Sequence, residues 1–194
     1  MATIDLPNNI LEALSTVLQQ LQQSLPEVKQ APDFSAIAFK WENGELKAIH
    51  QLKRIELNDL KGIERQKEKV LQNTEQFLNG LPANDALLTG SRGTGKSSIV
   101  RALLTEYAEQ GLRLIEIERD DLSELPEIQK LIAERPEKFI VYCDDLAFNA
   151  EDENYRSLKS VLEGSLQSVS STFIIYATSN RRHMPPALML ENTP

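Results

Sequence analysis

The stretch from Gly90 to Ser97, Gly-Ser-Arg-Gly-Thr-Gly-Lys-Ser, constrains the fold of this chain more than any other part of it. It follows a short apolar run, Ala86–Thr89, and it precedes a segment with the composition of a helix, Ser98–Glu109. The order of strand, glycine loop and helix, with the pattern G-x-x-x-x-G-K-[ST], is typical of a loop that binds phosphate. Glycines let successive backbone N–H groups point inward, and the N-terminus of the helix adds positive charge at the same place. The stretch therefore predicts a nucleotide site, rather than a strand-to-helix turn without a ligand.

The fixed positions of this loop have separate chemical roles. Lys96 can reach the β- and γ-phosphates, and the Ser97 hydroxyl can bind Mg²⁺. The implied cofactors are ATP or ADP together with Mg²⁺. Contacts to the nucleotide are expected from Ser91, Arg92, Gly93, Thr94, Gly95, Lys96, Ser97 and Ser98.

The sequence after the loop has the pattern of a parallel β-sheet. Phe139–Cys143 and Phe173–Ala177 are unbroken apolar runs, as expected of strands that are buried on both faces. Alternation with helical segments predicts an α/β fold of the P-loop NTPase type, a parallel sheet flanked by helices. The expected strands are Ala86–Thr89, Leu112–Glu118, Phe139–Asp144 and Thr172–Thr178, and the expected helices are Lys96–Glu109, Leu125–Glu134 and Asn154–Leu166.

The N-terminal part is predicted to be an appendage over residues 1–56, separate from a nucleotide-binding domain over residues 57–194. Leucines at alternating spacings of three and four predict a helix over residues 9–25, which either packs on its own domain or joins copies of the chain. Phe34–Glu42 and Glu45–His50 flank Asn43-Gly44, a pair that suits a two-residue β-hairpin turn. Because an isolated hairpin is marginally stable, we expect it to dock on a larger element.

Polar side chains follow the predicted strands, and the carboxyl ends of parallel strands are where open α/β sheets bind ligands. Asp144 follows a buried run and would hold Mg²⁺ opposite Ser97. Asp145 would orient or deprotonate the attacking water, and Asn180 would hydrogen-bond the γ-phosphate or that water. The predicted catalytic residues are therefore Asp145, Asn180 and Lys96, and the predicted metal ligands are Ser97 and Asp144.

Arg181 and Arg182 come directly after Asn180, and the sequence leaves their roles open. They could stabilise phosphate charge, contact a neighbouring subunit, or lie on the surface.

Charge and cysteine use restrict the class of protein. The chain of 194 residues has a formal net charge of −8, which gives no support to a nucleic-acid partner but leaves local basic patches open. Cys143 is the single cysteine, so no disulfide can form within the chain. No apolar run approaches the length of a membrane span, and the first basic residue is Lys29, which disfavours a signal peptide. We therefore expect a cytoplasmic protein that does not contact membranes.

These motifs together resemble the AAA+ ATPase family over about residues 33–192. Gly90–Ser97 is similar to its Walker A loop, Phe139–Asp145 to its Walker B strand, and Tyr176–Asn180 to its sensor 1 strand. Leu57–Ile63 resembles the segment that grips adenine, so the resemblance implies base contacts from Leu60 and Ile63.

A narrower resemblance is carried by three further stretches. They are similar to a family of uncharacterised bacterial AAA+ proteins, known as a domain of unknown function. The stretches are Gly62–Lys67, Cys143–Leu146 and Tyr176–His183.

The chain departs from the AAA+ pattern at two places. The second acid of Walker B is usually glutamate, whereas this chain has Asp145, which is one methylene shorter. Only Met184–Pro194 follow the sensor 1 region, which is too short for the arginine finger and the helical lid with sensor 2. The resemblance thus implies a form truncated before the lid.

The leading hypothesis is an ATP-binding module of an AAA+ ATPase, in which binding and hydrolysis of MgATP remodel a protein partner. One alternative is a nucleotide-gated binding module with negligible hydrolysis, which the truncation favours. Another is a small-molecule or nucleotide kinase, although the sequence shows neither an arginine-rich lid nor an acceptor pocket. The identity of the client and the formation of a homo-oligomer stay open.

Overall fold

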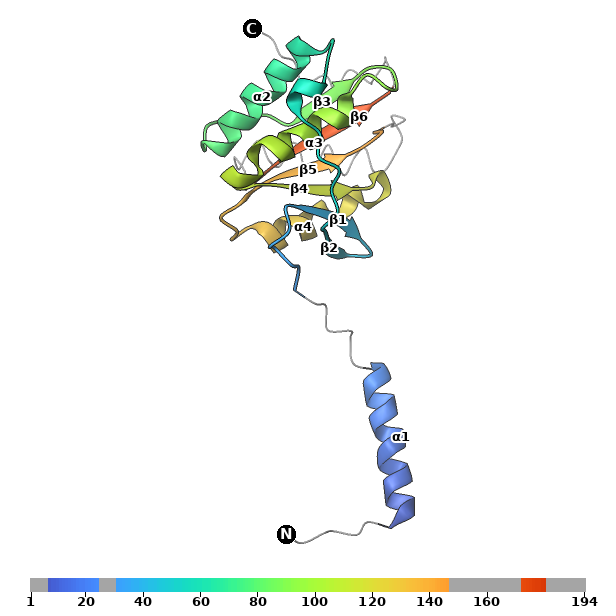
Figure 1. The fold of residues 1–194 in the computed structure, drawn as a ribbon. Coiled ribbons are helices and arrows are strands. Elements are labelled where there is room, and N and C mark those ends of the chain that lie inside the picture. Colours follow the sequence, from blue (N-terminus) through green and yellow to red (C-terminus); the bar gives the residue numbers. More distant parts are fainter. Residues whose placement is uncertain (1–6, 25–30, 147–171, 181–194) are drawn as a thin grey trace. The chain divides into compact units, whose positions relative to one another are not determined.

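The computed structural model describes residues 7–24, 31–146 and 172–180, and it divides into two compact units, one up to Ala31 and one from Pro32 onward (Figure 1). The helix predicted over Asn154–Leu166 lies outside the described residues, as do Arg181 and Arg182.

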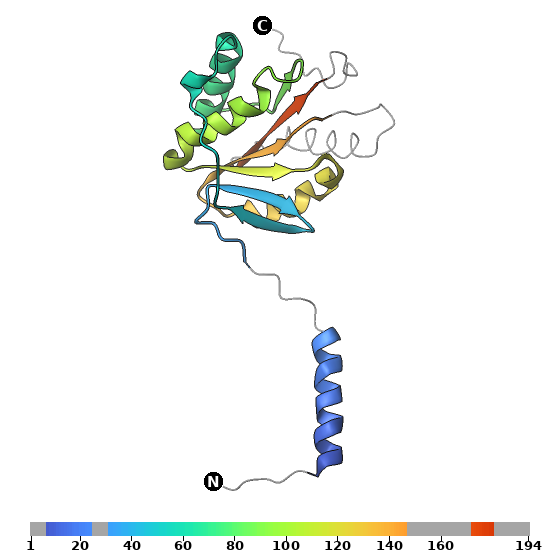
Figure 2. The ribbon, with the colours of Figure 1, turned by 45° about the vertical axis from the view of Figure 1, so that its right-hand side comes forward.

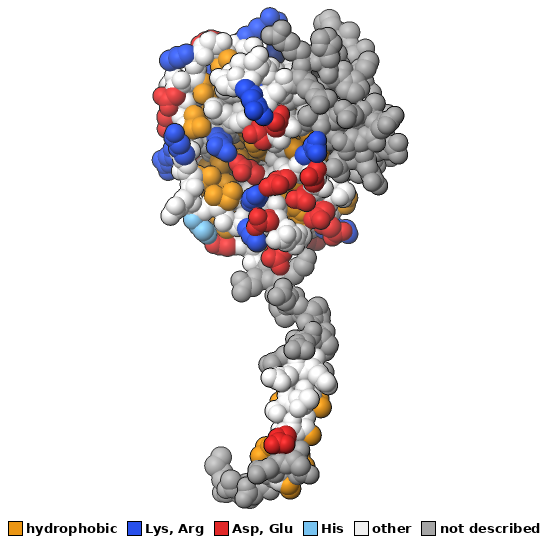
Figure 3. All heavy atoms as spheres, turned by 90° about the vertical axis from the view of Figure 1, so that its right-hand side faces the viewer, with side chains coloured by type: hydrophobic (Ala, Val, Ile, Leu, Met, Phe, Trp, Pro, Cys, Tyr) orange, Lys and Arg blue, Asp and Glu red, His pale blue; other side chains and the backbone are white. Residues whose placement is uncertain are grey.

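The described residues of the first unit form one helix, α1 (Asn8–Ser24). Leu11, Leu14 and Leu18 lie on it at the spacing that predicted the helix, and they are 48%, 46% and 59% exposed. Glu12 is the only charged residue between Asn8 and Ser24, and Figure 3 shows apolar side chains among mostly uncharged polar ones along this helix.

The second unit is a mixed α/β structure. Its strands are β1 (Ala38–Glu42), β2 (Glu45–Ile49), β3 (Ala86–Thr89), β4 (Leu112–Ile117), β5 (Lys138–Cys143) and β6 (Phe173–Ser179). Its α-helices are α2 (Glu64–Leu78), α3 (Lys96–Tyr107) and α4 (Leu125–Ile132). Short 3₁₀ helices span Leu57–Asp59, Ala108–Gln110 and Arg119–Glu124. The strands and helices predicted from the sequence in the described residues of this unit agree with these bounds to within about two residues, except that the first hairpin strand, predicted from Phe34, begins at Ala38.

The six described strands form one sheet in the order β2-β1-β4-β5-β6-β3. All neighbouring pairs are parallel except β1 and β2, which form an antiparallel hairpin. The carboxyl ends of β3, β5 and β6 therefore lie at one edge of the sheet, where the predicted ligand residues follow them.

Helices cover both faces of the sheet, as Figures 1 and 2 show. Alternate residues of β5 show the division: Ile140 and Tyr142 pack in the cluster with α2 and α3, and Phe139 and Val141 pack in the cluster with α4. This two-sided burial is the reason why β5 and β6 read as continuous apolar runs, and it confirms the predicted P-loop α/β fold class.

The hairpin belongs to the sheet. β1 pairs in parallel with β4, for example Phe39 with Ile115, and the Trp41 indole N–H donates to Glu124 Oε2 at 2.5 Å. The domain boundary predicted after residue 56 therefore falls inside the second unit. The physical reason is that the edge of β4 offers unpaired backbone groups, and the hairpin satisfies them. Asn43 and Gly44 have φ values of 54° and 72°, as the predicted turn requires.

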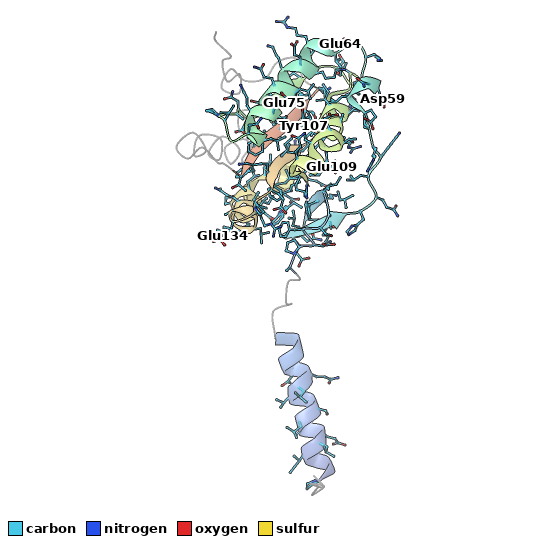
Figure 4. The ribbon with its side chains drawn as sticks, turned by 60° about the vertical axis from the view of Figure 1, so that its left-hand side comes forward. Asp59, Glu64, Glu75, Tyr107, Glu109 and Glu134 are labelled. Atoms are coloured by element: carbon cyan, nitrogen blue, oxygen red, sulfur yellow. The ribbon has the colours of Figure 1, made fainter. Side chains whose placement is uncertain are left out.

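The helix after the glycine loop is anchored at its far end. The Tyr107 hydroxyl on α3 donates to Glu75 Oε1 on α2 at 2.8 Å, and Figure 4 shows the two side chains between the two helices. α3 also buries Ile99, Val100 and Leu103. Because α3 is fixed along its length, its N-terminus at Lys96 is held in place relative to the sheet.

Candidate nucleotide site

The glycine loop has the backbone conformation that its sequence predicts. Gly90, Gly93 and Gly95 have φ values of 151°, 78° and 85°, a region that side chains rarely adopt, and α3 begins directly afterwards at Lys96. A Cβ on Gly95 would lie 3.2 Å from Ile63 Cδ1, so any larger residue at this position would also crowd the Ile63 side chain. The Gly90 N–H donates to the Ser179 carbonyl at 3.2 Å, which attaches the start of the loop to the end of β6.

The Lys96 ammonium group donates three hydrogen bonds at the mouth of the loop. Its acceptors are the carbonyls of Gly90 and Ser91, each at 2.8 Å, and Asn180 Oδ1 at 3.0 Å. An ammonium group has three donors, so all of them are satisfied here. Lys96 thus connects the loop after β3 with the end of β6.

Ser97 and Asp144 meet although they are 47 residues apart in the sequence. The Ser97 hydroxyl lies 3.1 Å from Asp144 Oδ1 and 3.3 Å from Oδ2. Burial raises the pKa of Asp144, but hydrogen bonds from neighbouring hydroxyls and from the Asp145 N–H lower it by more, so its pKa lies below the usual value. The carboxyl is therefore ionised at neutral pH, as a metal ligand must be.

Asp145 is reached by two side chains from other elements. Asn180 Nδ2 donates to Asp145 Oδ1 at 2.7 Å, and Arg92 Nη2 lies 3.4 Å from Asp145 Oδ2. The side chain of Arg92 is 84% exposed, so its ion pair contributes little to stability. Asp145 has a φ of 51°, which is uncommon for a residue other than glycine. This turn of the backbone brings the short aspartate side chain to Asn180.

The residues of the loop and the strand ends line a cleft of about 370 Å³. Its lining consists of Arg92, Gly93, Thr94, Gly95, Lys96, Ser97, Ser98, Asp144, Asp145 and Asn180. Apart from Ser91, Leu60 and Ile63, this set contains all the predicted site residues. The Ser91 backbone still takes part, because its carbonyl accepts hydrogen bonds from Lys96 and from Thr94 Oγ1.

Leu60 and Ile63 lie beside the loop and not in the lining of the cleft. Both are partly buried against the cluster that packs with α3. The Lys67 ammonium group donates to the carbonyls of Leu57 at 2.9 Å and Leu60 at 3.2 Å, and so fixes the short turn that carries Leu60. Sequence reasoning placed Lys67 in a stretch that resembles the narrower family but assigned it no contact, because its acceptors are backbone carbonyls that come together only in the folded turn.

Two buried hydroxyls near Asp144 were also missed. Thr178 is 1% exposed and hydrogen-bonds the Asp144 carboxylate. The Tyr142 hydroxyl is buried and makes no hydrogen bond of good geometry within the described residues, and this burial raises its pKa. Both could have been found from the sequence, because each is a hydroxyl-bearing residue in an apolar strand, two residues before a predicted site residue.

Cys143 packs away from this cleft. It is 1% exposed in the cluster that packs with α4, and burial raises the pKa of its thiol to about 12. Among the described residues, no group of three or more His, Cys, Asp or Glu side chains could hold a metal ion. None of the described helices is both long enough and apolar enough to cross a membrane.

Residues 34–194 match the family described as "Protein of unknown function (DUF815)". The chain belongs to the DUF815 family. The match leaves α1 outside it and includes the hairpin together with the glycine loop and all the strand ends that line the cleft. No curated protein matches this DUF815 chain.

Solved structures share the fold of this DUF815 chain at low sequence identity. The HORMA:CdnC:Trip13 complex of E. coli MS115-1 gives a TM-score of 0.53 at 12% identity, covering 69% of this chain and 61% of the solved one. Trip13 from Rhizobiales gives 0.50 at 15% identity, with coverage of 68% and 59%. PCH-2 from C. elegans gives 0.50 at 18% identity, with coverage of 64% and 39%. The chain thus spans between two fifths and about three fifths of the length of these structures.

The fold of this DUF815 chain is that of an AAA+ P-loop domain. The family of unknown function predicted from Gly62–Lys67, Cys143–Leu146 and Tyr176–His183 is confirmed. The AAA+ fold predicted from Gly90–Ser97, Phe139–Asp145 and Tyr176–Asn180 is confirmed as well.

Proposed function

We propose that this DUF815 domain binds MgATP in the cleft at the ends of β3, β5 and β6 and hydrolyses it to ADP and phosphate. The observation that carries the proposal is the meeting of Ser97 with Asp144 and of Lys96 with Asn180, since each pair joins the glycine loop to another strand end. A glycine turn without a ligand would need none of these partners.

The phosphates would lie in the loop. Backbone N–H groups between Gly90 and Ser97 and the N-terminus of α3 supply the positive field for them. Lys96 would exchange one or more of its oxygen partners for oxygens of the β- and γ-phosphates. Leu60 and Ile63 would contact the base. The position of Ile63 Cδ1, 3.2 Å from where a Cβ on Gly95 would lie, supports this because it sets that segment beside the loop.

The residues near Asp144 fit Mg²⁺. A hydroxyl and an ionised carboxylate are the hard oxygen ligands that Mg²⁺ prefers, and Mg²⁺ usually takes few protein ligands and keeps several waters. Ser97 and Asp144 would hold the ion, and the buried Tyr142 hydroxyl, which makes no hydrogen bond of good geometry within the described residues, would hydrogen-bond a water bound to it. When bound, Mg²⁺ would neutralise charge on the phosphates.

Asp145 and Asn180 would act on the attacking water. The water oxygen forms a bond to the γ-phosphorus, the bond from this phosphorus to the β,γ-bridging oxygen breaks, and the Asp145 carboxylate accepts a proton from the water. Asn180 would orient the water or the γ-phosphate. The left-handed backbone at Asp145 supports this assignment in place of the usual glutamate, because it brings the shorter side chain to Asn180 at the cleft.

The energy of hydrolysis would be used to remodel a protein partner in the cytoplasm. A structure with the same fold is a complex of Trip13 with HORMA and CdnC, which supports a protein as the client. Formation of a homo-oligomer is a further part of this proposal, and nucleic acid is a weaker candidate partner because the net charge is −8.

Phosphate release from MgATP tests the chemistry. The wild-type chain should release phosphate, and Asp145→Asn should bind nucleotide as the wild type does but lose turnover. If the wild type binds nucleotide and releases no phosphate, it is a nucleotide-gated binding module and the hydrolysis part of the proposal is wrong. Transfer of a γ-labelled phosphate to a hydroxyl acceptor instead of water would identify a kinase.

A further inference from the structure

Thr178 connects three consecutive residues of the turn after β5. Its hydroxyl donates to Asp144 Oδ1 and accepts from the Asp145 backbone N–H at 3.0 Å. Its carbonyl accepts from the Leu146 N–H at 2.6 Å. Thr178 is 1% exposed, so water does not compete for these bonds.

The directions of these hydrogen bonds require a hydroxyl at this position. The Asp145 N–H can only donate, and it is shared between Thr178 Oγ1 and Asp144 Oδ1, which it reaches at 3.0 Å. The ionised Asp144 carboxylate can only accept. A side chain between them must accept from one and donate to the other, which a hydroxyl does with a single oxygen.

The turn that Thr178 holds is one that needs support. Asp145 has a φ of 51°, and a residue other than glycine keeps such a backbone only where its surroundings determine it. The turn sets two side chains at once: Asp144 toward Ser97, and Asp145 toward Asn180. A substitution at Thr178 would therefore alter the positions of both aspartates of the proposed site and leave the glycine loop unchanged.

We propose that Thr178 is a positioning residue that fixes the Asp144 carboxylate for Mg²⁺ and the Asp145 carboxylate for the attacking water. This inference rests on the proposed MgATP hydrolysis. Thr178 itself touches neither the nucleotide nor the reacting atoms in this account; it acts through the two aspartates.

Thr178→Val tests the role of the hydroxyl, because valine keeps the branched shape and removes the oxygen. Three quantities are measured: nucleotide affinity in EDTA, the Mg²⁺ concentration that gives half-maximal ATP binding, and kcat for phosphate release. Thr178→Val should keep nucleotide affinity in EDTA within about twofold, and should raise the Mg²⁺ requirement and lower kcat by ~10–100-fold each. Thr178→Ser should restore both values to near those of the wild type.

Thr74→Val is the matched control for a buried threonine. Thr74 is fully buried on α2, and its hydroxyl contacts the Val70 carbonyl and the Tyr176 hydroxyl, away from the cleft. If Thr178→Val and Thr74→Val lower activity equally, in proportion to lost thermal stability, Thr178 has a structural role only and the inference is wrong. Unchanged Mg²⁺ requirement and kcat in folded Thr178→Val would overturn it as well.

The outcomes separate this inference from the function on which it rests. A wild-type chain that binds no nucleotide contradicts both. A wild-type chain that binds MgATP normally, with a Thr178→Val variant that does the same, contradicts only the role of Thr178. If Thr178→Val does not fold, Thr178→Ala is compared with Thr178→Ser for the same three quantities, with the same expected contrast.

Discussion

The side-chain amide of Asn180 donates to the Asp145 carboxylate at 2.7 Å, across the ends of two neighbouring parallel strands. The carbonyl oxygen of the same amide accepts from the Lys96 ammonium group at 3.0 Å. One asparagine therefore connects the residue proposed to act on water with the residue proposed to act on phosphate. Asn180 is therefore the first residue to replace in a test of the proposed turnover.

Replacement of Asn180 by alanine should separate binding from turnover. The glycine loop and Ser97 remain, so nucleotide affinity should change by only a few fold. Phosphate release should fall by about 10²–10³-fold, the usual cost of losing one donor that stabilises a transition state. Nucleotide titration and steady-state phosphate release on the same preparation measure both. Turnover equal to that of the wild type would contradict the role of Asn180.

Replacement of Ser97 by alanine should act through the metal ion. The variant should need a higher Mg²⁺ concentration for ATP binding, because one of the two proposed protein ligands is lost, while its affinity for nucleotide in EDTA should stay near that of the wild type. Thr105→Ala is the control, since Thr105 lies on the same helix and its hydroxyl donates to the Arg101 carbonyl at 3.3 Å. Equal Mg²⁺ dependence in Ser97→Ala and the wild type would argue against this ligand.

Gly95→Ala should destabilise the chain by two separate effects. A positive φ costs a non-glycine residue about 1–2 kcal/mol, and the new Cβ would also lie 3.2 Å from Ile63 Cδ1. Gly111→Ala is the matched control, because Gly111 has a φ of 94° and no atom within 4 Å of the added Cβ. Chemical denaturation of both variants should therefore show the larger loss for Gly95→Ala.

The contact with Ile63 can be tested by a double mutant. Ile63→Val removes the Cδ1 atom, so Gly95→Ala should lower the free energy of unfolding by less in that background than in the wild type. If Gly95→Ala lowers the stability equally in both backgrounds, Ile63 Cδ1 does not crowd the added Cβ.

Asp85→Asn should stabilise the chain at neutral pH. Burial raises the pKa of Asp85, and the hydrogen bond from the Ile175 N–H, at 2.6 Å, offsets this only in part. Because the folded pKa is above the unfolded value, the wild type loses stability as pH rises from the unfolded pKa through the folded one. The advantage of Asp85→Asn should therefore be present at pH 7 and shrink as the pH falls toward 4.

Asp33→Asn should change the folding stability in the opposite direction when it is measured in the same way. Hydrogen bonds from Ser35 lower the pKa of this exposed carboxyl, so the ionised form favours folding. Its replacement should lower the stability of the chain at pH 7 and make little difference at low pH.

A wild type that is more stable than Asp85→Asn at pH 7 would contradict the argument that burial of the ionised Asp85 carboxylate destabilises the fold.

Sequence reasoning found the elements with strong local patterns. The glycine loop, the apolar runs of β5 and β6 and the Asn43-Gly44 turn each have one physical interpretation, and the fold class follows from them. The cleft was also predictable in part, since residues after parallel strands meet at one edge.

The parts that could not be predicted depend on pairing between distant segments. No feature of the hairpin sequence indicates that β1 joins β4, because the free edge of β4 appears only in the folded sheet. The roles of Thr178 and Lys67 are likewise visible only once their acceptors are in place. Asp145 was recognised as an acid after a strand, but its left-handed backbone, which brings it to Asn180, was not foreseen.

Calorimetric titration of MgATP into the wild type and Lys96→Ala tests the central claim most directly. The wild type should bind one nucleotide per chain with a saturable heat, because the loop and α3 are already arranged around the Lys96 ammonium group. Lys96→Ala should lose this heat while its circular dichroism spectrum stays unchanged. No saturable heat in the wild type, or the same binding in both proteins, would contradict a nucleotide site at Gly90–Ser97.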